Sequence, residues 1–176
     1  DERGEHAPWA SGWVEKARIW IAAKTFFLPE DHRPYACAQA VFVGPTDLSR
    51  WTPGQRRALL DFVRLGGAVF FHGPIDRASL KGAGEWEELL ATRSSSRAVR
   101  DGAELIVEDL EEGESLAWLD AADGSPAVPL ISARAVGPGT IGHLSSSLKA
   151  SSARPDVWSA LWAALPGSRY PSGISL

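Results

Sequence analysis

The stretch AQAVFVGPTDLSRWTPGQRRALLDFVRLGGAVFFHG, residues 38–73, decides the predicted fold. It holds two short apolar runs, at residues 38–44 and 68–73, with an amphipathic segment between them. A continuous apolar run of this length is typical of a strand that is covered on both faces, as in a parallel sheet. The stretch therefore predicts two parallel strands joined by a helix.

The segment between the two runs carries signals for the start and end of a helix. Thr52 and Gln55 form a T-x-x-Q capping box, and Pro53 stands at the position where proline suits the first turn. Gly66 and Gly67 follow the last periodic residue, where glycine adopts the left-handed conformation of a helix end. Strand, helix and strand form a βαβ unit, whose crossover we expect to be right-handed.

The rest of the chain is β-rich. Two prolines discourage regular structure at residues 28–35. Strands are predicted at 17–23, 103–110 and 114–120, short helices at 84–92 and 155–165, a loop at 94–97, and a hairpin formed by 127–136 and 139–148. We expect one α/β domain over residues 13–166, after a loose segment at 1–12 and before a tail at 167–176. Its mostly parallel sheet gains an antiparallel edge from the C-terminal strands.

Composition limits the classes of function. The formal net charge is −4 and no run of basic residues exceeds the pair Arg56-Arg57, so a nucleic-acid partner is not expected. No apolar run approaches the roughly 20 residues that span a bilayer. The single cysteine, Cys37, excludes an internal disulfide and a cysteine zinc site. The chain has no methionine, not even at position 1, which predicts that it is a fragment of a longer protein or a processed product.

Several residues of the βαβ unit match a family pattern. They are the apolar strand 41–43, the step Asp47-Leu48, Gln55, Ala58-Leu59, Val63, the pair Gly66-Gly67 and the strand 69–73. This pattern resembles class I glutamine amidotransferase-like domains, and most of all the degenerate versions in large bacterial membrane-anchored proteins. Residues 134–148 and 156–165 resemble the closing strand and the final helix of that family, so the resemblance covers residues 28–165.

The resemblance implies a three-layer, flavodoxin-like sandwich. Active members of the family carry a nucleophilic cysteine on a tight turn after a strand, and a later histidine activates it. The matching turn here is Phe71-His72-Gly73-Pro74, which has no cysteine, serine or threonine, and Cys37 precedes the first strand of the unit. The resemblance thus implies a non-catalytic module without a cofactor, for binding or assembly with a protein partner or other domains of the parent chain. It favours an envelope-associated or periplasmic location, with the cytoplasm left open.

Three residues at predicted strand ends form the main candidate site. Open α/β sheets bind ligands at the carboxyl ends of their strands, where His72, Asp47 and Asp76 are expected to meet. His72, Asp47 and Gly73 are the candidate ligand-binding residues, for a small molecule or a glycan. The alternative is a hydrolase or metal-dependent enzyme that uses Asp47, His72 and Asp76. Both residues also have a purely structural explanation: His72 could form a hydrogen bond to nearby backbone, and Asp47 could form an Asx-turn.

Other candidates have simpler structural explanations. His143 shares a strand face with Ser145 and Ser147, which permits a Ser/His pair, but no acidic partner is identifiable. The sequence at 137–142 matches G-x-G-x-x-G, yet a strand follows where a nucleotide site needs a helix, so it predicts a hairpin turn.

Metal ligands and tryptophans give weaker signals. The run Glu30-Asp31-His32 is the densest set of metal-ligand types, but without a second spaced histidine we expect no metal site. Trp51 precedes the helix cap and either packs on that helix or belongs to an interaction surface.

Overall fold

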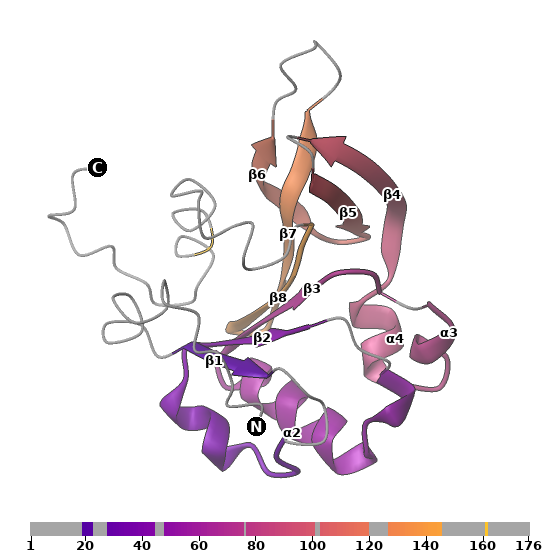
Figure 1. Ribbon diagram of the computed structural model, residues 1–176. Coiled ribbons are helices and arrows are strands. Elements are labelled where there is room, and N and C mark those ends of the chain that lie inside the picture. Colours follow the sequence, from indigo (N-terminus) through magenta and orange to yellow (C-terminus); the bar gives the residue numbers. More distant parts are fainter. Residues whose placement is uncertain are drawn as a thin grey trace, which may run out of the picture.

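The computed structural model describes residues 19–22, 28–44, 48–75, 77–100, 103–119, 127–145 and 161. Figure 1 shows a twisted sheet with helices beneath it and a β-ribbon that rises from one end. In the described part of the chain, no helix is both long enough and apolar enough to cross a bilayer.

The main sheet has the strand order β1-β2-β3-β8-β7-β6 in the described residues. Its strands are β1 (Ile19–Ala22), β2 (Ala40–Val43), β3 (Ala68–His72), β8 (Gly139–Leu144), β7 (Val128–Val136) and β6 (Glu114–Leu119). The first four in this spatial order pair in parallel, whereas β8 with β7 and β7 with β6 pair antiparallel. The predicted α/β class, with a mostly parallel sheet and an antiparallel C-terminal edge, is confirmed.

The predicted βαβ unit is confirmed by the pairing of its two strands. β2 and β3 are parallel neighbours, with Ala40 beside Ala68 and Val43 beside Phe71. Between them lies helix α2 (Pro53–Arg64), and Gln55 N–H donates to Thr52 Oγ1 at 3.1 Å while Thr52 N–H donates to Gln55 Oε1 at 3.0 Å. These two bonds are the predicted capping box.

Glycines allow the end of α2 to meet the sheet. Gly66 has a φ of 102°, in the left-handed region, and Gly67 N–H donates to the Phe62 carbonyl at 3.0 Å. Gly139, at the start of β8, lies so close to α2 that an added Cβ would stand 1.9 Å from the Val63 carbonyl oxygen. The turn 137–139 joins the predicted hairpin. Its second glycine, Gly139, is required because any side chain there would collide with the backbone of α2.

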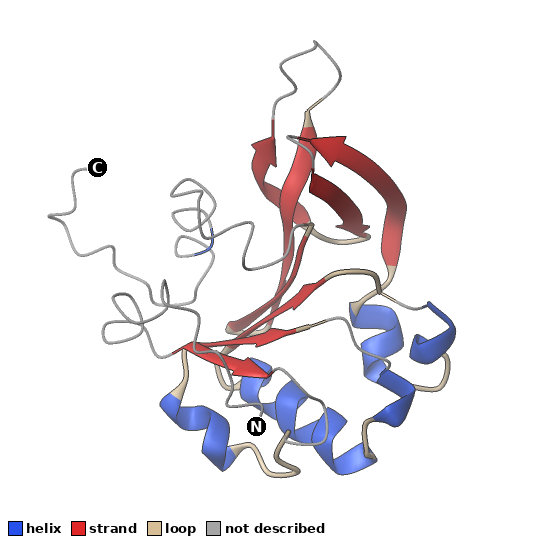
Figure 2. Cartoon of the chain, in the orientation of Figure 1, coloured by secondary structure: helices blue, strands red, loops and turns tan. Residues whose placement is uncertain are grey.

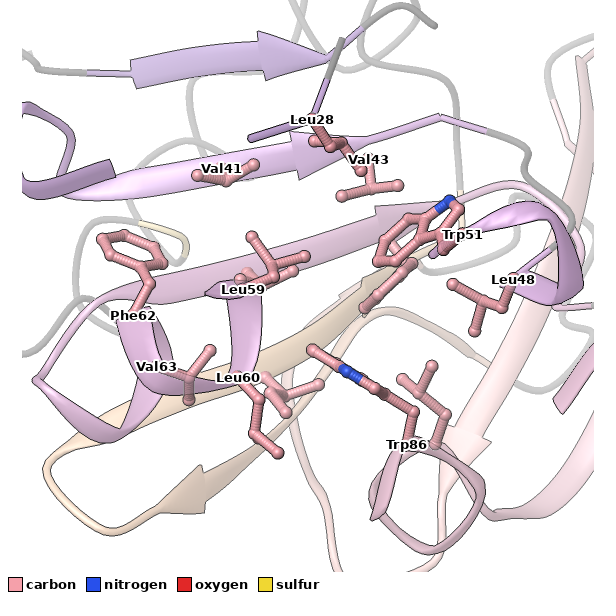
Figure 3. Close-up of a cluster of buried hydrophobic side chains, with 14 of the residues drawn as sticks. Leu28, Val41, Val43, Leu48, Trp51, Leu59, Leu60, Phe62, Val63 and Trp86 are labelled. Atoms are coloured by element: carbon pink, nitrogen blue, oxygen red, sulfur yellow. The ribbon is translucent and has the colours of Figure 1, made fainter. Parts of the chain in front are cut away.

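Helices lie along one face of the parallel strands (Figure 2). Besides α2 they are η2 (Arg33–Cys37), η3 (Leu48–Arg50), α3 (Arg77–Leu80) and α4 (Glu85–Leu89). The core on this face centres on two buried tryptophans (Figure 3). Trp51 stacks on Phe71 with a centroid distance of 6.3 Å and meets Trp86 edge-on at 6.4 Å. Of the two alternatives for Trp51, the structure shows the packed one, because the side chain is buried in this core and not exposed as an interaction surface.

A second apolar cluster lies on the opposite face of the strands. Phe42 and Phe70 stack there at 5.5 Å, and Leu161, which is helical, is buried in the same cluster. Leu161 is the one described position of the helix predicted at 155–165, and the other positions lie outside the described residues. The α/β class is thus established, whereas the finer three-layer arrangement is not.

Two local predictions are wrong. Residues 94–97 are not a loop, because they lie in β4 (Thr92–Arg100), which pairs antiparallel with β5 (Ala103–Leu110). Cross-strand bonds such as Ser95 Oγ to Glu108 Oε1 at 3.0 Å give these serines partners that sequence propensity does not foresee. Residues 28–35 run into η2, where Pro34 stands in the first turn and so interrupts no hydrogen bond.

Candidate functional site

The carboxyl ends of β2, β3 and β8 meet at one edge of the sheet, because these strands are parallel neighbours. Gly44 follows β2, and Gly73 follows β3. His72 is the last residue of β3, and His143 is the next-to-last residue of β8. We call His72, Gly73, Gly44 and His143 the edge site.

His72 is half-buried at this edge. A Cβ on Gly44 would lie 3.4 Å from His72 Nε2, so the imidazole ring extends over the end of the neighbouring strand. Burial lowers the pKa of His72 below its usual value of 6.5. The ring is therefore neutral at neutral pH, with one nitrogen that donates and one that accepts.

His143 is fully buried beside Phe71 in the register of β8 with β3. Its Nε2 lies 2.6 Å from the Gly73 carbonyl oxygen. A carbonyl only accepts, so Nε2 carries the proton and Nδ1 is left as an acceptor. Among the described residues, Nδ1 has no hydrogen-bond partner.

The pKa of His143 reflects this environment. This pKa is lowered to about 4, mainly by burial; the hydrogen bond to Gly73 opposes this effect, and the charge of a protonated His72 adds to it. A charged His143 would hold a second buried N–H without a described partner, which is unfavourable. His143 is thus a neutral hydrogen-bond donor to the backbone of the edge.

Gly73 turns the chain away from the sheet. Its φ of 85° lies in the left-handed region, which side chains other than glycine rarely adopt. Its carbonyl receives the bond from His143. The exit turn after β3 is therefore shaped by a glycine and held by a histidine from the adjacent strand.

The structure places part of the predicted trio. His72 lies at the carboxyl edge as expected, but Asp47 and Asp76 lie outside the described residues. Their meeting with His72 stays a prediction. Gly73, the fourth candidate, directly follows His72 and contributes its carbonyl to the bond with His143.

The possible Ser/His pair is not formed at the described positions. Ser145 is buried and its hydroxyl donates to the Pro129 carbonyl at 2.8 Å, while His143 Nε2 is engaged by Gly73. Ser146 and Ser147 lie outside the described residues. Ser145 therefore ties β8 to β7 and is not activated by His143.

The residues at 30–32 have local structural roles. Thr52 Oγ1 donates to Glu30 at 2.6 Å, and Asp31 accepts hydrogen bonds from the backbone and side chain of Arg33. The Arg33 bonds lower the pKa of Asp31 to about 2. No group of three or more metal-ligand side chains occurs in the described ranges. Cys37 is exposed and lies in η2, which precedes β2, away from the edge that carries His72.

Sequence reasoning missed two members of the edge site. His143 was considered with the serines of its own strand, whereas its partner is the Gly73 carbonyl, 70 residues away in the chain. Gly44 had no signal beyond ending an apolar run. The one usable signal was the expected parallel sheet, since pairing of β8 with β3 brings His143 to the exit turn.

No protein-family profile and no curated protein matches the chain. Glycoside hydrolases are among the solved structures that match. Gan42B, a GH42 β-galactosidase from G. stearothermophilus, is 13% identical with a TM-score of 0.45, over 84% of this chain and 30% of the enzyme. The β-galactosidase from Bacillus circulans sp. alkalophilus is 16% identical with a TM-score of 0.46, over 73% and 22%.

A third match is the exo-β-1,4-mannosidase Op5Man5 from Opitutaceae bacterium strain TAV5. It is 15% identical with a TM-score of 0.39, over 75% of this chain and 26% of the enzyme. The chain thus spans less than a third of the length of each of these enzymes.

These matches correct the family expectation. These three structures are two β-galactosidases and a mannosidase, not glutamine amidotransferases, so the resemblance drawn from residues 41–73 is wrong. The function that the resemblance implied, a non-catalytic amidotransferase-like module for binding or assembly, is overturned with it. The physical reason is that strand, capped helix and glycine-ended strand are general features of parallel α/β units and do not specify one family.

Proposed function

We propose that the domain binds a small, uncharged, hydroxyl-rich molecule at the edge site, with His72 as the principal contact. The observation that carries the proposal is the position of His72, neutral and half-buried at the carboxyl end of β3, with its ring over Gly44. Parallel α/β sheets place their ligands at this edge. Asp47 and Gly73 belong to the same proposal as further contacts.

The ligand class follows from hydrogen-bond chemistry. A neutral imidazole offers one donor and one acceptor, and a hydroxyl group can satisfy either. The chain adds acidic residues next to the same strand ends, Asp47 and Asp76, whose carboxylates accept bonds from hydroxyl groups. With Asp47 and Asp76 at the edge as the sequence predicts, their carboxylates would repel an anionic ligand, and a neutral His72 would not compensate for that repulsion.

The test is a binding measurement at neutral pH with defined probes. Galactose and mannose represent hydroxyl-rich molecules, and acetate and inorganic phosphate represent anions. In NMR titrations we expect the monosaccharides to shift signals of His72 and Gly73, and the anions to leave them unchanged. His72→Ala should weaken binding at least about tenfold, which corresponds to roughly 1.4 kcal/mol.

The matched control is His32→Ala. His32 is a partly exposed histidine at the N-cap of η2, away from the edge site, so its loss should leave the affinity unchanged. Absence of binding by all four probes would contradict the proposal. Turnover of a sugar derivative that His72→Ala abolishes would instead support the hydrolase alternative with Asp47, His72 and Asp76.

We also propose a third layer for the fold. Leu161 is helical and buried against the sheet face that carries Phe42 and Phe70, opposite to α2. A helix around Leu161 would make the arrangement a three-layer, flavodoxin-like sandwich. It would also extend one domain over residues 13–166, because that helix would share its core with β2 and β3.

A further inference from the structure

We propose that His143 is a positioning residue for the edge site: its imidazole holds the Gly73 carbonyl and thereby fixes the direction in which His72 leaves β3. This inference rests on the proposed function of the edge site. It assigns a role to a buried histidine that neither the strand pairing nor the apolar core requires.

The hydrogen bond defines the role of His143. Its Nε2 donates to the Gly73 carbonyl at 2.6 Å, from a strand that pairs with β3. The register places His143 beside Phe71, so its side chain reaches two residues beyond its neighbour to the exit turn. A regular ladder bond joins backbone to backbone, whereas this bond ties a side chain to the carbonyl that follows His72.

The surroundings of His143 are those of an apolar position. Ile141, two residues earlier on the same strand face, is fully buried in the core with Val69 and Phe71. An aliphatic residue would fill such a site without leaving a polar atom unsatisfied. His143 instead keeps Nδ1 buried with no partner in the described part of the chain. His143 therefore forms the bond to Gly73 while its Nδ1 atom stays buried without a hydrogen bond in the described part of the chain.

The consequence for the edge is geometric. Gly73 has a left-handed backbone with no side chain, so nothing of its own restrains the turn. The bond from His143 restrains the carbonyl of Gly73, and Gly73 directly follows His72 in the chain. Loss of the bond frees the turn and lets the His72 ring move away from Gly44 toward solvent.

The test uses variants with and without the donor. His143→Gln retains an N–H at about the position of Nε2, and His143→Leu retains volume without a donor. Ile141→Val is the matched control, because it changes buried volume on the same strand face and leaves the Gly73 bond intact. Histidine NMR titration reports the pKa of His72 in each protein, and ¹⁵N shifts report the tautomer of His143 in the wild type.

The expected results separate positioning from general stability. In the wild type, His143 carries its proton on Nε2. In His143→Leu, the pKa of His72 rises toward the usual histidine value and monosaccharide affinity falls at least about tenfold. His143→Gln and Ile141→Val keep both values near the wild type.

Two results would overturn the inference. One is a wild-type His143 that carries its proton on Nδ1. The other is a folded His143→Leu protein whose His72 titration matches that of the wild type. If His143→Leu does not fold, the wild-type tautomer and the comparison of His143→Gln with the wild type decide the question. The titrations need no ligand, so a failure of the proposed function, seen as no probe binding to the wild type, is distinguishable from a failure of this inference.

Discussion

At the residue scale, the edge site depends on two glycines and two histidines. Gly44 has no side chain where the His72 ring passes, and Gly73 adopts a backbone conformation that other residues rarely reach. His72 and His143 are both neutral at neutral pH because burial disfavours their charged forms. The described residues of the site therefore offer neutral hydrogen-bonding groups.

Gly44→Leu tests the contact between His72 and the end of β2. An added Cβ already reaches 3.4 Å from His72 Nε2, so a leucine side chain must displace the ring. We expect monosaccharide binding to fall at least about tenfold while stability changes by less than about 1 kcal/mol. Isothermal titration calorimetry and urea unfolding measure the two effects, and Gly82→Ala, at an open left-handed glycine, is the control for glycine loss. Unchanged affinity in Gly44→Leu would argue against a ligand over this strand end.

Stability should fall between pH 7 and pH 5 because of the buried histidines. The folded pKa of His143 is about 4 and its usual value is 6.5, so below pH 6.5 the unfolded chain binds a proton that the folded chain does not. The contribution of His143 is full above about pH 6.5 and decreases by up to about 1.4 kcal/mol per pH unit as pH falls toward 4. The pKa of His72 is lowered in the same direction.

Urea unfolding at pH 7 and pH 5 measures this dependence. His143→Gln removes one titrating group and should lose less stability over the interval than the wild type. Asp31, with a pKa of about 2 in the folded chain, titrates below this interval and does not obscure the result. Equal losses in both proteins would show that His143 titrates normally.

At the scale of elements, α2 is defined by local sequence at both ends. The capping box of Thr52 and Gln55 begins it, and Gly66 ends it. Gln55 also donates from Nε2 to the Leu28 carbonyl at 2.9 Å, which ties the segment before η2 to the helix. One polar side chain thus completes a cap and joins two elements.

Thr52→Ala should destabilise the protein by about 1 kcal/mol, and by up to about 2 kcal/mol if its bond to Glu30 contributes. The reason is that the Gln55 N–H loses its acceptor at the first turn of α2. Chemical denaturation measures the change, and Thr52→Ser is the control that retains the hydroxyl. A loss of equal size in Thr52→Ser would place the effect in the methyl group and not in the cap.

At the scale of the whole molecule, two apolar clusters sandwich the parallel strands. The cluster on the α2 face contains Trp51 and Trp86, and the other contains Phe42, Phe70 and Leu161. The β4–β5 ribbon joins this body through the Ile106 N–H, which donates to the Ser145 carbonyl at 3.0 Å. Residues from both halves of the chain therefore contribute to a common core.

Leu161→Ala tests the cover on the second face. Leu161 is 3% exposed in the cluster of Phe42 and Phe70, so truncation should cost about 2–5 kcal/mol of unfolding free energy. Leu65→Ala is the control, because Leu65 is 71% exposed and its loss should change stability by less than about 0.5 kcal/mol. Denaturant melts of both variants make the comparison. A Leu161→Ala protein as stable as the wild type would contradict a third layer at this position.

The sequence predicted those parts of the fold that depend on local signals. Residues 38–73 predicted the capped helix, the parallel pair β2–β3 and the placement of His72 at a strand end. Residues 127–144 predicted the hairpin β7–β8. The β4 strand was missed because its serines have little intrinsic preference for a strand and are ordered by pairing with β5. The resemblance to glutamine amidotransferase-like domains was wrong because capped helices and buried strands are common to many α/β proteins.

By itself, the sequence determined the period of the apolar residues, the helix caps and the glycine turns, because each is set by neighbours within a few positions. Only the tertiary structure decided that His143 bonds to Gly73 and that Gly44 makes room for His72. Both contacts join residues far apart in the chain, on strands whose order in the sheet differs from their order in the sequence. Strand order is decided by the packing of the whole core, and no local pattern encodes it.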